Sequence, residues 1–431
     1  MNQWTLKEIR VEAGTRAVAQ YAVEGEWAKY FTPQRQTFLE IFDRVGVCAL
    51  KEIPPSVLAV PFVCNILPAA WLCDAEIVAG ELDADFMDHV EEIKNGYREM
   101  YPMLNFGGKL TATPVRNAPD KPGTTDAAAF FSGGADAWTT LLRHLDERPV
   151  LTTLWGTDMS LDDAHGWNII WRNTQETADK FGLDAVAVKT DFRSVLDESE
   201  LNKLAEKSGD TWWHGFQHGI GLISHATPLA WLMGLRTVYI ASSFPASMKG
   251  TYTCASDPTI DNHVHFCGCG TVHDGYELNR QGKIAYILKR RAEIGKPISL
   301  RVCFLSSDGG NCCHCEKCYR TILELVSEGA DPNEYGFVWD RAAIRRCRKD
   351  MQGRLTSAQF NVDQYYPPIQ KRMEENKDRI ANYEDYEWLL RFDFSRFNDA
   401  PTKILLTNLR KTSLWQALRK AKRVLLTRGR R

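Results

Sequence analysis

The middle of the chain alternates short apolar runs with longer segments of helical periodicity. Strands are expected at 127–131, 150–155, 185–188 and 237–241, and helices at 136–145, 168–180 and 224–235. Strands that alternate with helices form βαβ units, and the parallel sheet they build is covered by helices on both faces. The sequence therefore predicts a doubly wound α/β domain whose ligand site lies beyond the carboxyl ends of the strands.

Regions of different character flank this domain. Residues 1–125 mix short apolar runs with a helical pattern at 86–101, and they end in a Pro-, Gly- and Asn-rich stretch that indicates a linker. We expect an N-terminal α+β domain without a catalytic motif, which recognises substrate or pairs with a second copy or another protein. A central domain at 126–330 and a charged, helical C-terminal extension at 331–431 would follow.

Composition and the N-terminus bear on where the protein works. The chain has 431 residues, of which 44% are hydrophobic and 25% charged, as in soluble globular proteins of more than one domain. The first residues lack the apolar core of a signal peptide. The most apolar run, 57–73, is interrupted by Pro61, Asn65 and Pro68, so we expect buried core rather than a membrane span. These features predict a cytoplasmic protein, in which cysteines stay reduced or bind metal.

The net charge of −2 is unevenly distributed. Nine Lys or Arg and no acidic residues occur in 408–431, so the rest of the chain is acidic and general nucleic-acid binding is not expected. Within this tail Leu414, Trp415, Leu418 and Leu425 have helical spacing. The tail is therefore either an amphipathic helix on an anionic membrane or acidic partner, or a solvated terminus.

A glycine loop follows the first strand of the predicted sheet. Gly133 and Gly134 let backbone N–H groups approach an anion, and the helix that follows adds the positive end of its dipole. Ser132 can donate a hydroxyl, and Asp136 is placed to hold Mg²⁺. The loop is neither a Walker A motif nor a dinucleotide fingerprint. It predicts a phosphate site, with a plain strand–helix turn as the alternative.

Four cysteines have the spacing of a metal site: Cys303, Cys312, Cys315 and Cys318. Four thiolates close a tetrahedral Zn²⁺ shell, which is typical of a structural site. Cys313 is expected to be a bystander, and His314 is a weaker alternative ligand. An iron–sulfur cluster and unligated buried cysteines are the competing interpretations.

Both motifs resemble those of a known family. Ser132-Gly133-Gly134-Ala135-Asp136 resembles the Ser-Gly-Gly-x-Asp-Ser signature of the PP-loop ATP pyrophosphatases, except that Ala137 replaces the final hydroxyl residue. The four-cysteine spacing is similar to that of 7-cyano-7-deazaguanine synthases within this superfamily, with Cys313 in place of a glycine. A helix start at 280–284 resembles the Lys-x-x-Ile start of PP-loop enzymes and includes Lys283. The resemblance covers about 126–330.

The resemblance implies a Rossmann-like fold, ATP and Mg²⁺ as cofactors, and a ligase that adenylates a carboxylate or carbonyl oxygen. A nitrogen nucleophile would then displace AMP, on a substrate of the deazapurine type by analogy. The loop from Ser132 to Asp136 would bind the nucleotide, and Lys283 would stabilise the leaving pyrophosphate. Asp158, after the second strand, would face nucleotide or metal, or cap the next helix.

Two other functions stay open. A tRNA-type sulfurtransferase would need a reactive thiol, for which Cys254, Cys267 and Cys269 are candidates. A degenerate nucleotide-binding regulatory subunit would account for Ala137.

The segment 256–276 is a candidate substrate-covering loop. Asp257, Asp261 and Asp274 are its possible substrate contacts. Its alternating His263, His265, Cys267 and Cys269 suggest a second metal, although packing and turn roles are the commoner explanation for such a run.

Overall fold

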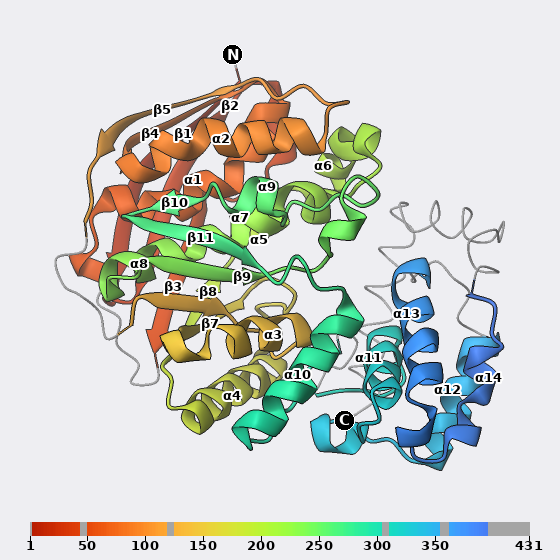
Figure 1. The fold of residues 1–431 in the computed structure, drawn as a ribbon. Coiled ribbons are helices and arrows are strands. Elements are labelled where there is room, and N and C mark those ends of the chain that lie inside the picture. The colour runs from red at the N-terminus through yellow and green to blue at the C-terminus, as the bar shows by residue number, and fades with distance from the viewer. Residues whose placement is uncertain (1, 44–49, 119–124, 304–309, 354–361, 395–431) are drawn as a thin grey trace, which may run out of the picture. The chain divides into compact units, whose positions relative to one another are not determined.

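The computed structural model describes residues 2–43, 50–118, 125–303, 310–353 and 362–394 (Figure 1). The chain divides into two compact units, of which one extends to Lys296 and the other begins at Pro297. The sequence led us to expect divisions near residues 125 and 330 instead.

The first unit is built around one eleven-stranded sheet. Its strands, in spatial order, are β10 (His265–Phe266), β11 (Cys269–Asp274), β9 (Thr237–Ala241), β6 (Ala127–Phe130), β7 (Val150–Trp155), β8 (Ala185–Thr190), β3 (Gln36–Asp43), β2 (Arg16–Glu24), β1 (Gln3–Glu12), β4 (Glu76–Asp83) and β5 (Lys109–Val115).

Five neighbouring strands, from β8 to β11, run parallel. Read in chain order their arrangement is 3-2-1-4-5, with β6 first in the sequence, which is the order of a doubly wound sheet. In Figure 1, α3 (Ala135–Arg143), α4 (Ala164–Phe181) and α10 (Arg280–Ile294) lie on one side of these strands. The helices α1 (Pro55–Leu72), α7 (His218–Ile223) and α8 (Thr227–Met233) lie on the other. The α/β fold with a large, mostly parallel sheet is thus confirmed, and its winding reverses between β6 and β9.

The N-terminal region extends this sheet rather than forming a compact unit of its own. β3 pairs antiparallel with β8, so that backbone hydrogen bonds tie residues before 125 to the central strands. Side chains of α1 and of the central helices also share one hydrophobic core, which includes Trp71, Ile223 and Leu229. A boundary at residue 125 would cut both the sheet and this core, which explains why the compact unit continues to Lys296.

Helix α1 differs from the expected interrupted run. It is one continuous helix of 18 residues that contains Pro61 and Pro68, and it is long and apolar enough to cross a membrane. However, 89% of it is buried inside the protein, as in a core helix. Asn65 is satisfied there, because its amide donates to the Phe192 carbonyl at 2.9 Å and its oxygen accepts from Gln217 at 2.6 Å. Packing on all sides therefore outweighs the helix-breaking tendency of the two prolines.

The other expected elements of the first unit are present. Strands β7 and β9 have the expected bounds, and α2 (Ala84–Met100), α3 and α4 match within a few residues at most of their ends. The segment 224–235 is shorter as an α-helix than expected. It divides into the 3-10 turn η6 (Ser224–Ala226) and α8, which has Pro228 in its first turn. Proline is accepted there because it has no N–H to donate.

The second unit is helical in its described part. It contains α11 (Glu316–Ser327), η8 (Pro332–Tyr335), α12 (Arg341–Gly353), α13 (Val362–Glu375) and α14 (Glu387–Leu390). All residues of α11 except Lys317 are buried, and the helix contacts α13. The expected helical character of this region is confirmed, whereas the basic segment 408–431 lies outside the described residues.

Candidate functional site

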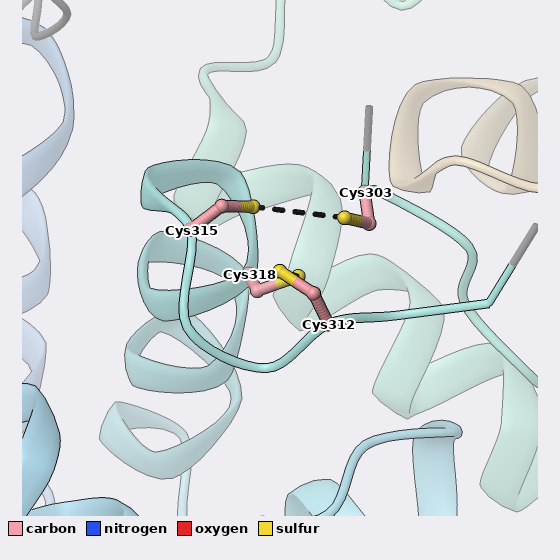
Figure 2. A group of neighbouring side chains, drawn as sticks. All are labelled: Cys303, Cys312, Cys315 and Cys318. Carbon is pink, nitrogen blue, oxygen red and sulfur yellow. Dashed lines mark hydrogen bonds between the residues drawn. The ribbon is translucent and has the colours of Figure 1, made fainter. Parts of the chain in front are cut away.

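The four expected cysteine ligands come together in the second unit (Figure 2). Cys303 and Cys315 have their sulfurs 3.8 Å apart, those of Cys312 and Cys318 are 3.9 Å apart, and all four lie within 4.8 Å of one another. A tetrahedral zinc site with bonds of about 2.3 Å separates its sulfurs by about 3.8 Å. The cluster can therefore hold a metal ion such as zinc.

Electrostatics within this cysteine cage favour a cation. Hydrogen bonds from Cys312 and Cys315 hold the pKa of Cys303 far below that of an ordinary thiol. The pKa of Cys318 is raised instead, since ionising it beside the other three thiols is unfavourable. The protein alone thus supports only partial ionisation, and a divalent cation would let all four thiols ionise.

Asn311 joins the two sides of the cage. Its side-chain oxygen accepts the backbone N–H groups of Val302 at 3.0 Å and Cys303 at 3.3 Å. Its amide donates to the carbonyls of Leu300 and Gly336 at 2.7 and 2.9 Å. Cys303 is therefore held beside Cys312 by polar contacts that do not depend on a metal. The sequence gives no signal for this role, because a lone Asn carries no pattern.

Cys313 is a bystander, as expected. Its thiol accepts the N–H of Val338 at 3.2 Å, and it is not one of the four clustered ligands. Its φ of 56° lies in the left-handed region, where glycine is favoured. In the family whose cysteine spacing this chain resembles, glycine occupies this position. Glycine adopts a left-handed backbone conformation most easily, and that is the conformation found here. His314 is exposed, and its Nδ1 pairs with the Cys312 carbonyl at 2.6 Å rather than with the cage.

The glycine loop lies in the first unit, between β6 and α3. Gly133 has φ 78°, and Gly134 is the N-cap of α3. Ser132 is exposed, and its hydroxyl accepts the Gly134 N–H at 3.4 Å. Ala137 is buried in α3. The loop thus has the left-handed glycine and the following helix that the sequence predicted. It lies at the end of β6, next to the point where the winding of the sheet reverses.

Asp136, in the first turn of α3, contacts the start of α10. Its carboxylate accepts from Arg280 at 2.6 Å and from Lys283 at 3.0 Å. Lys283 is almost fully buried and also donates to the Ser242 carbonyl after β9. Asn279 fixes the start of α10 by accepting the Gly282 N–H at 2.8 Å. Two cations, one carboxylate and the glycine loop therefore gather at one sheet edge.

Asp158 lies in the turn after β7 and does not cap the next helix. That cap is Asp163, whose carboxylate accepts the Gly166 N–H at 2.9 Å. The charge of Asp158 instead affects the pKa of His218. Burial lowers this pKa, but Cys254 and, to a smaller extent, Asp158 raise it above the usual value. Asp158 is exposed, and it lies at the edge where ligands bind in such sheets.

The acidic residues of 256–276 have mostly structural partners. Asp274 accepts from Thr140 at 2.8 Å and Arg143 at 3.0 Å, so it anchors α3. Asp261 is fully buried and pairs with His273 at 2.8 Å. Asp257 lines a pocket, together with Phe244, Lys249, Cys254 and Tyr276 among others.

The run from His263 to Cys269 does not place its four polar side chains on one strand face. β10 has only two residues, and the chain turns at Cys267, which has φ 55°. Of the four, only His265 belongs to a possible metal group, together with Asp85 and His89 of α2. Burial and nearby Asp83 raise the pKa of Cys267 well above the usual range, and burial raises that of Cys269 to about 12. These two thiols are therefore poor nucleophiles.

Cys254 has different surroundings, which the sequence analysis did not identify. It is 4% exposed and interacts with His214 and His218. His214 Nδ1 lies 2.8 Å from Asp210 Oδ1. His214 and His218 are four residues apart in one helical stretch, and this spacing was the available signal for their pairing. The contact with Cys254, some forty residues away, depends on the tertiary fold.

Comparison with known proteins adds no assignment. No family model matches the chain, and no curated protein matches it.

Proposed function

We propose that this protein is an ATP-dependent ligase of the PP-loop type. It would adenylate a carboxylate or carbonyl oxygen of a small molecule with release of pyrophosphate, and a nitrogen nucleophile would then displace AMP. A deazapurine is the substrate class suggested by the sequence resemblance. The cofactors would be ATP and Mg²⁺, with a structural Zn²⁺ in the cysteine cage.

The observation that carries the proposal is the place of the glycine loop in the sheet. In open α/β sheets, ligands bind beyond the carboxyl ends of the strands where the winding reverses. That point here lies between β6 and β9, and the loop from Ser132 to Gly134 directly follows β6. A left-handed Gly133 followed by the N-terminus of a nine-residue helix is suited to bind phosphate through backbone N–H groups.

The charged groups beside the loop suit an ATP-cleaving site. Lys283 and Arg280 are held on one face by Asp136, so both cations are already oriented. Negative charge that builds on departing pyrophosphate would be stabilised by these two cations once they exchange Asp136 for phosphate oxygens. When bound, Mg²⁺ would neutralise phosphate oxygens, and the partly exposed carboxylate of Asp136 is the group available to hold it.

The cysteine cage is suited to a structural zinc ion rather than to a catalytic metal. All four ligands are sulfurs at tetrahedral spacing, which leaves no open position for a substrate. Its role would be to stabilise the second unit.

The test is product analysis of ATP turnover together with metal analysis. Purified protein is incubated with Mg²⁺, ATP labelled in the α and γ phosphates, ammonia, and carboxylated deazapurines. We expect AMP and pyrophosphate, with about one zinc per chain. ADP and orthophosphate would contradict the proposal. ATP binding without AMP would favour a regulatory subunit, and iron in place of zinc would indicate an iron–sulfur cluster.

A further inference from the structure

Two glycines bring the helical stretch that carries His214 and His218 close to its neighbours. A Cβ added at Gly215 would lie 2.8 Å from the Tyr101 hydroxyl, and one at Gly219 would lie 2.2 Å from the Ala255 carbonyl. Each histidine is therefore followed by a residue that only glycine can occupy without displacing the opposing backbone or side chain. This stretch begins as the π-helix η5 (Trp213–Gln217), an irregularity that is frequent at functional sites.

Asp210, His214 and Cys254 form a connected chain of polar groups. An ionised Asp210 can only accept, so the 2.8 Å contact makes His214 Nδ1 the donor and leaves Nε2 for the thiol. The second oxygen of Asp210 accepts from Tyr101 at 3.1 Å and Thr253 at 3.2 Å, which fixes the carboxylate. The Ala255 N–H donates to the His214 carbonyl at 2.8 Å, holding the thiol segment beside the imidazole.

These contacts favour a thiolate–imidazolium pair. Burial alone would raise the pKa of Cys254, but the neighbouring His214 and His218 outweigh this effect and lower the pKa to about 6. Burial also opposes protonation of His214, yet Asp210 and Cys254 raise its pKa to about 10. The other titratable groups that interact with this cluster are Tyr97, Tyr101, Asp158 and Asp261.

The cluster opens toward the same sheet edge as the glycine loop. Cys254 lines a pocket with Phe244 and Tyr276, in the segments that directly follow β9 and β11. Ser242, between β9 and this pocket, accepts a hydrogen bond from Lys283. Lys283 in turn pairs with Asp136 beside the loop. A thiol and the candidate phosphate-binding groups are therefore linked through one short segment after β9.

We propose that Cys254 is a nucleophile that accepts an acyl group from an activated acyl substrate. Its thiolate attacks the carbonyl carbon, a C–S bond forms, and the C–O bond to the phosphate breaks as that leaving group departs with the electron pair. An amine then attacks the thioester, the C–N bond forms, and the thiolate leaves while the amine proton passes to water. His214 and His218 stabilise the thiolate, and Asp210 positions His214. The use of an acyl-adenylate as the donor rests on the proposed function.

The first test is alkylation by iodoacetamide, which needs neither ATP nor a substrate. Full-length protein is alkylated from pH 5 to 9 and each cysteine is quantified by peptide mass spectrometry. Cys73 is the internal control, because it is more exposed than Cys254 but burial raises its pKa to about 11. We expect Cys254 to react faster than Cys73, with its rate rising near pH 6. His214→Gln should slow alkylation of Cys254 at pH 6.5 about tenfold.

The second test uses acetyl phosphate as a small activated acyl donor. We expect acetylation of Cys254 that is removed by hydroxylamine at neutral pH and is absent in Cys254→Ser. Faster alkylation of Cys73 than of Cys254, or equal acetylation of all accessible thiols, would overturn the inference even if His214→Gln failed to fold. Neither readout depends on ATP. The protein could therefore fail as a ligase and still show a reactive Cys254, and the two failures can be told apart.

Discussion

The cysteine cage of the second unit and the glycine loop of the first solve different binding problems. The cage uses four side chains, and Asn311 holds its two halves together through backbone contacts. The glycine loop offers mainly backbone N–H groups, and its nearest charges, on Asp136, Arg280 and Lys283, neutralise one another. A metal would add to a set of ligands already in place, whereas a nucleotide would have to replace ion pairs. Loss of one ligand should therefore damage the cage far more than loss of one group should damage the loop.

The largest effect is expected from Cys318→Ser, because three thiolates do not close the metal shell. Structural zinc contributes on the order of 10 kcal/mol to the folding of small zinc domains. We expect loss of the metal and of the helical signal of the second unit, measured by elemental analysis and circular dichroism. Cys313→Ser is the matched control and should retain metal. Full metal content in Cys318→Ser would contradict the four-ligand site.

Lys283→Met should have the next largest effect, on chemistry rather than on folding. Removing a fixed cation from a developing negative charge typically costs a hundredfold or more in turnover. We expect AMP formation to fall by about this factor with a smaller change in ATP affinity. Lys289→Met, on the exposed face of the same helix, is the control. Equal AMP formation by the two variants would remove Lys283 from the site.

Gly133→Ala separates backbone strain from phosphate binding. Its φ of 78° makes a side chain unfavourable by about 1 kcal/mol, and Gly182→Ala meets the same strain at φ 69° with open space around it. We expect similar losses of thermal stability in both variants. Only Gly133→Ala should weaken ATP binding, by about tenfold in titration calorimetry. The same ATP affinity in both would mean that the loop is a plain turn.

The parts that the sequence predicted are those in which local pattern and tertiary fold agree. The central strands have one apolar run each, and the cage ligands have a spacing that brings them together through one turn and one helix start. Residues 1–125 were harder, because pairing of β3 with β8 is a long-range choice that no local pattern encodes. The proximity of Cys254 to His214 was not predicted for the same reason. Pro61 and Pro68 led us to expect an interrupted run, but α1 is continuous because packing around it outweighs local propensity.

The smallest effect is expected from Cys313→Gly. Glycine relieves the left-handed backbone at φ 56° but loses the contact of the thiol with the Val338 N–H. We expect a net stabilisation of the second unit of up to about 1 kcal/mol in denaturant titration, with metal content unchanged. Loss of metal would instead make Cys313 a ligand and revise the cage.

The most direct test of the nucleotide site is a crystal structure of the full chain with Mg²⁺ and α,β-methylene-ATP, which resists cleavage between these phosphates. The account predicts the triphosphate on the backbone N–H groups of Gly133 and Gly134, with Lys283 turned from Asp136 toward a phosphate oxygen. A nucleotide bound elsewhere, with the contacts of Asp136 to Arg280 and Lys283 unchanged, would contradict it.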